Sequence, residues 1–361
     1  MTNTNFDRAL AEITREYGAR ALIPAAAIRS PARIPTGLFG LDARLGGGIP
    51  LGRVIELVGE FSAGKSSLAL SIAAQAQRLD RRTYAPLGED GQPMRAVWLD
   101  LAGTFDADWA AALGVDVSTL YVAPATYLEQ AYDMVMALIR TGEVDLLVID
   151  DIASMAPSDE TEDSMEKQHM GLAARGNNKG LRKITAEFNR LVQTHDHAPA
   201  VLMINQMREK LGVLFGSPET SPGGRGREFF ASLRIKLWPE ALGKSIKDDD
   251  EEIVGRVSTY KIEKNKVNGT YGQGQFTIYL HDFGPFRRGM LDDSANLLES
   301  AVRFGLVEQK GAFYAFAGDQ RVQGKAKAVA FLLEHPDVRQ DLLRGVMGRF
   351  MGERSVDTPS N

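Results

Sequence analysis

The chain has 361 residues, enough for one large domain with smaller attachments. Hydrophobic residues make up 44% and charged residues 25%, as in ordinary soluble proteins. Cysteine is absent, which excludes disulfides and thiolate metal sites, and the net charge of −5 excludes a general basic coating for nucleic acid but not a local basic groove.

No apolar run is long enough to span a bilayer, so we expect no membrane partner. The N-terminal stretch MTNTNFDRALAEITREYG lacks the apolar core of a signal peptide. These features fit a cytoplasmic protein.

The first predicted element is a helix of about three turns, because Phe6, Leu10, Ile13 and Tyr17 form one apolar stripe. A helix this short must pack on something. The pattern alone favours its own domain over a neighbouring subunit. The segment AAAIRSPARIP then reads as a linker, so residues 1–30 form a helix and linker outside the core.

Residues 31–285 are predicted to form an α/β core. Four apolar runs alternate with helical stretches, which is typical of a buried, mostly parallel sheet. Ligands bind such sheets at the carboxyl ends of the strands. The runs are Val54–Val58, Ala96–Leu99, Leu146–Ile149 and Ala200–Ile204.

Later in the chain, Ser232–Leu237 and Ser258–Lys266 alternate with period two, as half-exposed strands do. The KSIKDDDEE stretch between them reads as a solvated loop. Short helices and an aromatic strand, Phe313–Phe316, predict a small C-terminal α/β lobe over 286–351. The tail, 352–361, is predicted to be disordered.

A phosphate-binding loop follows the first strand. The stretch GEFSAGKS matches GxxxxGK[ST] in full, and the helical pattern Ser67–Gln77 follows it. This context favours a nucleotide site over a chance glycine turn. Lys65 supplies charge to the β and γ phosphates, and the Ser66 hydroxyl can bind Mg²⁺. The predicted nucleotide contacts are Gly59, Glu60, Phe61, Ser62, Ala63, Gly64, Lys65, Ser66 and Ser67.

The stretch LLVIDD supplies the second half of this site. Many buried strands end in aspartate, but together with the phosphate-binding loop Asp150 is predicted to bind Mg²⁺ alongside Ser66. The site is therefore predicted to bind a nucleoside triphosphate with Mg²⁺. In VWLDLAGTFDADW, by contrast, no carboxylate closely follows Asp100 where one might orient the attacking water.

The motifs together resemble the bacterial RecA recombinases over nearly the whole chain. The segments INQMREKLGVLFGSPETSPGG, FFASLRIKL and KNKV match, and the similarity continues through QGKAKAVAFL. HMGLAAR and GVLFGSPET are far more specific than the phosphate-binding loop, and Tyr84–Arg95 is extra sequence. The resemblance implies a P-loop ATPase core with an N-terminal polymerisation helix. It implies protomers stacked head-to-tail on single-stranded DNA, with ATP between neighbours, and strand exchange with homologous duplex. The N-terminal helix, through Phe6, Leu10 and Ile13, then packs on the adjacent protomer.

The resemblance also assigns roles to individual residues. Asp106 and Trp109 would contact adenine, and Gln206 would sense the γ-phosphate. Lys264 and Lys266 would reach the neighbour's ATP, although on residue type alone they read as solvated lysines. Phe229 would lie at the protomer interface.

Two loops, about 163–170 and 207–221, would bind DNA. Basic side chains would neutralise phosphates and apolar ones would insert between bases. The alternatives are a flexible acidic loop at TEDSMEKQ and a hinge at Gly-Gly-Arg-Gly. In SLRIKLWPEALG the family's basic charge for duplex binding is reduced. The candidates are Met170, Gly171, Leu172, Arg175, Arg182, Arg208, Lys210, Leu211, Gly223, Gly224 and Arg225.

The water-activating glutamate of the resembled family falls at Ala102. Such acid–base help contributes roughly 10²–10⁴-fold in rate, so we expect tight ATP binding and slow hydrolysis. Asp151 could replace the glutamate only if its strand has ended, because adjacent residues on a strand face opposite ways.

Three functions compete. The first is an ATP-dependent strand-exchange recombinase acting in DNA repair, which the lysines and DNA loops favour. The second is a paralogue that modulates another filament, which Ala102 favours. A ring helicase is disfavoured by the DNA-loop motifs and the N-terminal helix.

Overall fold

The computed structural model describes most of the chain, with gaps at the two predicted DNA-binding loops. The described residues are 4–28, 30–154, 156–158, 172–194, 197–209, 219–220, 229–241, 245–318 and 320–356.

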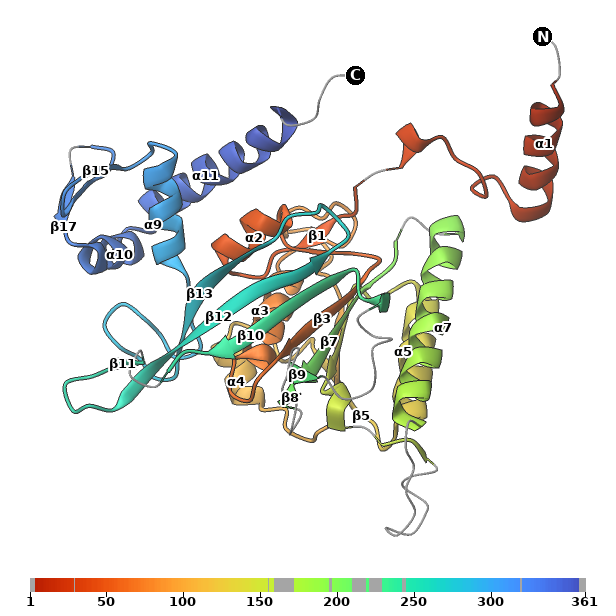
Figure 1. Ribbon diagram of the computed structural model, residues 1–361, viewed down its shortest axis with the longest axis horizontal. Helices are drawn as coiled ribbons and strands as arrows, with labels where there is room; N and C mark the ends of the chain where they lie inside the picture. Colours follow the sequence, from red (N-terminus) through yellow and green to blue (C-terminus); the bar gives the residue numbers. More distant parts are fainter. Residues whose placement is uncertain are drawn as a thin grey trace.

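A large twisted sheet forms the centre of the molecule (Figure 1). Six of its strands are parallel, and all of these except the exposed edge strand Tyr121–Pro124 are rich in buried apolar residues, as strands covered on both faces require. The four predicted apolar runs are all confirmed as strands of this set. In spatial order the parallel strands are β10 (Leu233–Pro239), β3 (Val54–Gly59), β7 (Ala200–Gln206), β6 (Leu146–Asp150), β4 (Ala96–Asp100) and β5 (Tyr121–Pro124).

Antiparallel strands extend the sheet beyond β10. The prediction that Ser232–Leu237 is half exposed is wrong, because β10 lies between β3 and β12 and its first three residues are buried. The KSIKDDDEE stretch is partly a hairpin, since β11 pairs with β12. The added strands are β12 (Ile253–Asn265), β13 (Gly272–Tyr279), β14 (Leu291–Asp292) and β11 (Ile246–Lys247), and separate two-stranded pairs are β1 (Arg33–Ile34) with β2 (Ile49–Pro50) and β8 (Arg208–Glu209) with β9 (Glu219–Thr220).

Successive residues of each central strand face two different hydrophobic cores. In β6, for example, Leu146 and Val148 join one core while Leu147 and Ile149 join the other. Helix α3 covers the first face and the pair α5 and α7 covers the second. The core helices are α2 (Phe39–Leu45), α3 (Lys65–Gln77), α4 (Ala107–Ala112), α5 (Leu128–Thr141) and α7 (Leu172–Thr194), with short 3₁₀ turns at Ala25–Ala27 and Ile152–Ser154.

The predicted N-terminal helix is confirmed as α1 (Asn5–Tyr17), which Thr4 and Asp7 cap reciprocally. It stands apart from the sheet (Figure 1), and none of its residues is buried within the described chain. The side chain of Phe6 is 70% exposed. The expectation from pattern alone, that this helix packs on its own domain, is therefore wrong.

A third hydrophobic cluster holds together the C-terminal lobe. Phe39 and Ala43 of α2 contribute to this cluster, which joins the lobe to the core. The predicted disorder from residue 352 is wrong as far as Val356, because α11 continues to that residue, while 357–361 lie outside the described residues. The elements of the lobe are α9 (Ser294–Arg303), β15 (Glu308–Lys310), β16 (Phe313–Ala315), β17 (Arg321–Gln323), α10 (Lys325–Glu334) and α11 (Pro336–Val356).

Candidate nucleotide site

The phosphate-binding loop connects the carboxyl end of β3 to the amino end of α3. Gly64 takes a left-handed conformation with φ +79°, and a Cβ atom there would lie 2.3 Å from Ile278. Glycine is also required at Gly59, where a Cβ would lie 1.9 Å from the carbonyl oxygen of Leu237. The loop therefore packs against Leu237 of β10 at its start and against Ile278 of β13 at its end, where it enters α3.

Lys65, the first residue of α3, is buried beneath this loop. Its Nζ donates hydrogen bonds to the carbonyl oxygens of Gly59, at 3.1 Å, and Glu60, at 2.6 Å. Burial lowers the pKa of Lys65, while the nearby carboxylates of Asp151 and Asp150 oppose that shift. A cation at this place, close to exposed backbone N–H groups, suits the oxygens of a polyphosphate.

Acidic side chains end two neighbouring strands beside the loop. Asp100 of β4 is in register with Asp150 of β6. Burial raises the pKa of Asp150 to about 6, a hydrogen bond from Ser66 lowers it, and Asp151 and Asp100 raise it further. The accumulated negative charge around a hydroxyl would favour a divalent cation.

Among the described residues, no three acidic or histidine side chains converge closely enough to hold a metal by themselves. Mg²⁺ characteristically binds through one or two protein oxygens together with phosphates and water. The pair Ser66 and Asp150 fits that kind of incomplete site.

Asp151 and Gln206 form a direct contact across the strand ends. The Gln206 amide donates to Oδ2 of Asp151, and the backbone N–H and hydroxyl of Ser154 donate to Oδ1 at 2.7 and 2.6 Å. Strand β6 ends at Asp150, so the condition that Asp151 lies beyond the strand is met. Both carboxylate oxygens of Asp151 nevertheless already accept hydrogen bonds.

The strand β4 leads into a loop that carries Ala102. Both oxygens of Asp100 accept backbone N–H groups, from Thr104 and Phe105, at 3.0 Å each. Gly103 takes the left-handed position in this turn, with φ +66°. Ala102 is exposed, so the loop presents a methyl group where the resembled family has a carboxylate.

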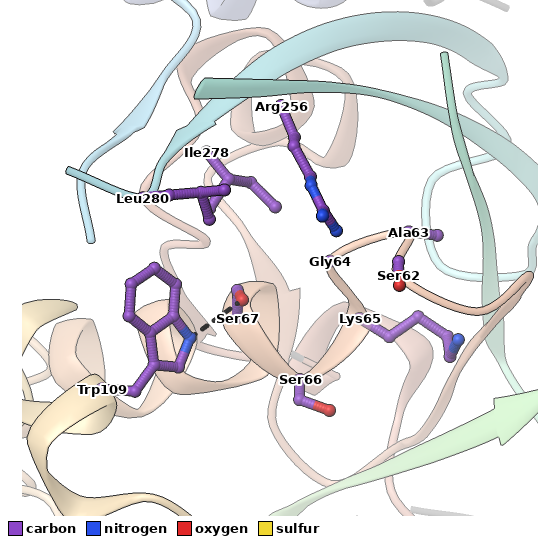
Figure 2. A pocket seen from close by; sticks show the side chains of 10 residues that line it. All are labelled: Ser62, Ala63, Gly64, Lys65, Ser66, Ser67, Trp109, Arg256, Ile278 and Leu280. Atoms are coloured by element: carbon purple, nitrogen blue, oxygen red, sulfur yellow. Dashed lines mark hydrogen bonds between the residues drawn. The ribbon is translucent and has the colours of Figure 1, made fainter. Parts of the chain in front are cut away.

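Trp109 lies at the opposite end of the site from Lys65. Its indole N–H donates to the hydroxyl of Ser67 at 3.2 Å (Figure 2). Asp106 caps α4 by accepting the backbone N–H of Trp109 at 2.9 Å. The guanidinium of Arg288 stacks 5.1 Å from the centre of the indole ring. The aromatic face is thus held in a fixed orientation by three contacts.

A cavity of about 320 Å³ runs along the loop toward Trp109 (Figure 2). The sequence interpretation named its loop residues but missed three others, which belong to no motif and lie outside the strands that it predicted. Arg256, Ile278 and Leu280 come from β12 and from the end of β13.

Lys264, Lys266 and Phe229 cluster away from this cavity. The Lys264 and Lys266 ammonium groups donate to the Phe229 carbonyl oxygen at 3.1 and 3.4 Å. Lys266 also lies 5.2 Å from the centre of the Phe229 ring, which is 72% exposed. In a single chain, these lysines do not line the P-loop cavity.

Most DNA-binding candidates cannot be placed. Leu172, Arg175 and Arg182 lie on α7, where both arginines are exposed. The backbone of Arg208 belongs to β8, which pairs with β9 at the base of the second loop. The candidates that lie outside the described residues are Met170, Gly171, Lys210, Leu211, Gly223, Gly224 and Arg225.

The fold and the strand-end site define the chain as an α/β protein of the P-loop nucleotide-binding class. Two family models together cover most of the chain, the RecA N-terminal domain over residues 4–283 and the RecA C-terminal domain over 295–351. The chain belongs to the RecA family, whose members are DNA-dependent ATPases of recombination and repair.

Similar proteins match along nearly their whole length. Protein RecA of Kineococcus radiotolerans is 36% identical over 98% of this chain and 94% of its own. Protein RecA of Salinispora tropica is 37% identical over 94% of this chain and 90% of its own. That of Streptomyces ambofaciens is 38% identical over 93% and 83%. Within the described residues, no helix combines the length and apolar character needed to cross a membrane.

Proposed function

We propose that this protein forms helical filaments on single-stranded DNA with ATP and promotes homologous pairing and strand exchange, while hydrolysing ATP slowly. The observation that carries the proposal is the cluster at the strand ends. Lys65, Asp150, Asp151 and Gln206 meet there, and Gln206 directly precedes a predicted DNA-binding loop.

In this proposal the loop 59–67 binds the triphosphate through its backbone and Lys65. Ser66 and Asp150 hold Mg²⁺, which supplies positive charge to the β and γ phosphate oxygens when bound. Trp109 and Asp106 lie at the adenine end, where the indole is already oriented by Ser67. The loop and Trp109 line one cavity of about 320 Å³, in which a nucleotide would lie.

Gln206 connects the nucleotide to DNA. Its amide donates to Asp151, whose charge also acts on Lys65. A γ-phosphate beside Lys65 would compete for the same amide hydrogens. Released from Asp151, Gln206 would change the geometry of the segment 207–221, which begins at the next residue. Asp151 thus serves to position Gln206 and remains the candidate base.

Assembly is supported by two exposed features. Helix α1 offers an apolar face that no described part of its own chain covers. Phe229, Lys264 and Lys266 form a second exposed group, suited to reach a neighbour's γ-phosphate. A head-to-tail contact between two different surfaces builds an open helical filament.

Ala102 favours one alternative, a paralogue that binds ATP and DNA but modulates another recombinase filament. The segment SLRIKLWPEALG points the same way, because Trp238 and Pro239 stand where the family has more basic charge, although Lys236 lies 5.7 Å from the Trp238 ring. The retained lysines 264 and 266 favour the recombinase.

Three measurements on the purified protein test the proposal. Electron microscopy with ATP and single-stranded DNA should show long helical filaments. A strand-exchange assay with homologous duplex should give joint molecules. Steady-state turnover with single-stranded DNA should lie well below that of a relative that retains the glutamate. A protein that binds ATP and DNA but forms no long filaments alone would support the modulator and reject the recombinase, and filaments without strand exchange would also reject the recombinase.

A further inference from the structure

Arg256 occupies an unusual place on β12. Side chains two residues apart on a strand share a face. Arg256 shares its face with Ser258 and Tyr260, both fully buried, and its partner across β13 is Ile278, also buried. Arg256 is therefore the position at which the core-facing side of β12 reaches the edge of the core.

That edge lies against the phosphate-binding loop. Gly64 is so close to Ile278 that a Cβ atom would come within 2.3 Å of its side chain. The β12–β13 face thus covers the loop, and Arg256 lines the same cavity as Ser62–Ser67 and Trp109. Figure 2 shows its side chain extending from the strand toward the loop at Gly64.

The two cationic side chains of the cavity, Lys65 and Arg256, differ in the partners that they have. Lys65 donates to two carbonyl oxygens and lies near the carboxylates of Asp151, Asp150 and Glu60. Arg256 has no hydrogen-bond or ion-pair partner among the described residues. A guanidinium directed over a loop of backbone N–H groups is complementary to phosphate oxygens, which it can bind through two parallel hydrogen bonds.

The lining of the cavity indicates which phosphates are involved. The cavity extends from the loop to Trp109, whereas Asp150, Asp151 and Gln206 at the γ-phosphate end do not line it. Arg256 therefore lies on the side of the base and the α and β phosphates.

We propose that Arg256 binds the α or β phosphate of a nucleotide held by its own protomer. The inference rests on the proposed nucleotide site and adds a residue to it. Because ADP retains both phosphates, Arg256 strengthens the binding of ATP and ADP equally. Such uniform binding raises affinity without accelerating the chemical step.

The test compares Arg256→Gln with Lys261→Gln, a matched control. Lys261 is an exposed lysine on the opposite face of β12 and does not line the cavity. Fluorescence titrations with labelled ADP and with a non-hydrolysable ATP analogue give both dissociation constants. For Arg256→Gln, we expect both to rise by the same factor, on the order of tenfold, as for a charge-assisted hydrogen bond near solvent.

Three outcomes would overturn the proposal: unchanged dissociation constants, a loss confined to the ATP analogue, or an equal loss in Lys261→Gln. The last would show a general effect of charge. Wild-type protein that binds neither nucleotide would instead reject the proposed function itself. Circular dichroism melting of both variants checks folding, which should be unaffected because both side chains are exposed.

Discussion

Replacing Ala102 with glutamate should restore fast hydrolysis. Ala102 is exposed in a loop whose shape is fixed by its neighbours, since Asp100 holds two backbone N–H groups and Gly103 takes the left-handed position. A longer side chain at residue 102 therefore disturbs no core packing, and its carboxylate extends from the end of β4, next to Asp150 on β6.

The size of the gain follows from two terms. A positioned general base contributes about 10²–10⁴-fold to the rate. An exposed glutamate must lose up to about 2 kcal/mol of rotamer freedom to act, and each 1.4 kcal/mol costs about tenfold. We therefore expect Ala102→Glu to raise turnover toward the lower end of that range, about 10²-fold.

The assay is steady-state ATP hydrolysis with saturating single-stranded DNA. Ala102→Gln is the matched control, because glutamine has the same shape but cannot accept the proton, and it should stay near wild type. Equal turnover of wild type and Ala102→Glu would refute the reasoning. In that case unchanged turnover of Asp151→Asn, which keeps an acceptor for Ser154, would exclude Asp151 as the remaining base.

Further predictions concern stability, assembly and base binding. Burial raises the pKa of Asp42 to about 7, so its contribution is present at pH 4 and is lost as pH rises to 7. Asp42→Asn should flatten the fall in urea stability between about pH 4 and 7, a difference on the order of a few kcal/mol, and an unchanged slope would contradict this. Phe229→Ala should raise the protein concentration needed for filament assembly, measured by light scattering, by at least tenfold, while ADP binding persists. Assembly of the variant at the same concentration as wild type would argue against a role of Phe229 at the protomer interface. Trp109→Ala should weaken ADP binding about 2–10-fold and Trp109→Phe less, and equal losses would exclude stacking.

The parts of the fold that were predictable are those in which local pattern and environment agree. The apolar run Leu146–Ile149 predicts a buried strand, and it forms β6, whose side chains are covered on both faces of the sheet. The phosphate-binding loop was predictable because its glycines meet strict backbone requirements. Gly59 and Gly64 tolerate no larger residue.

Long-range placement was not predictable from the same patterns. Arg256 lies outside the predicted strand Ser258–Lys266 and belongs to no motif, and only the pairing of β12 with β13 brings it over the loop. The extra segment Tyr84–Arg95 carried no motif, yet Asp80 organises it by accepting the backbone N–H groups of Arg82, Thr83 and Gln92. Those bonds hold the pKa of Asp80 down to about 2.

Ala102 and Arg256 act in the same direction on the proposed filament. A ligand that binds only the assembled form stabilises it by an amount that grows with the logarithm of its concentration over its dissociation constant. When hydrolysis is slow, the lifetime of the assembled form depends on nucleotide dissociation rather than on turnover. Alanine in place of the glutamate at residue 102 lengthens the period during which ATP stays bound. Arg256, as a second cation beside Lys65 in the same protomer, slows the dissociation of both ATP and ADP. Arg256→Gln should therefore shorten filament persistence after ATP is withdrawn, whereas Ala102→Glu should shorten it while ATP is still present.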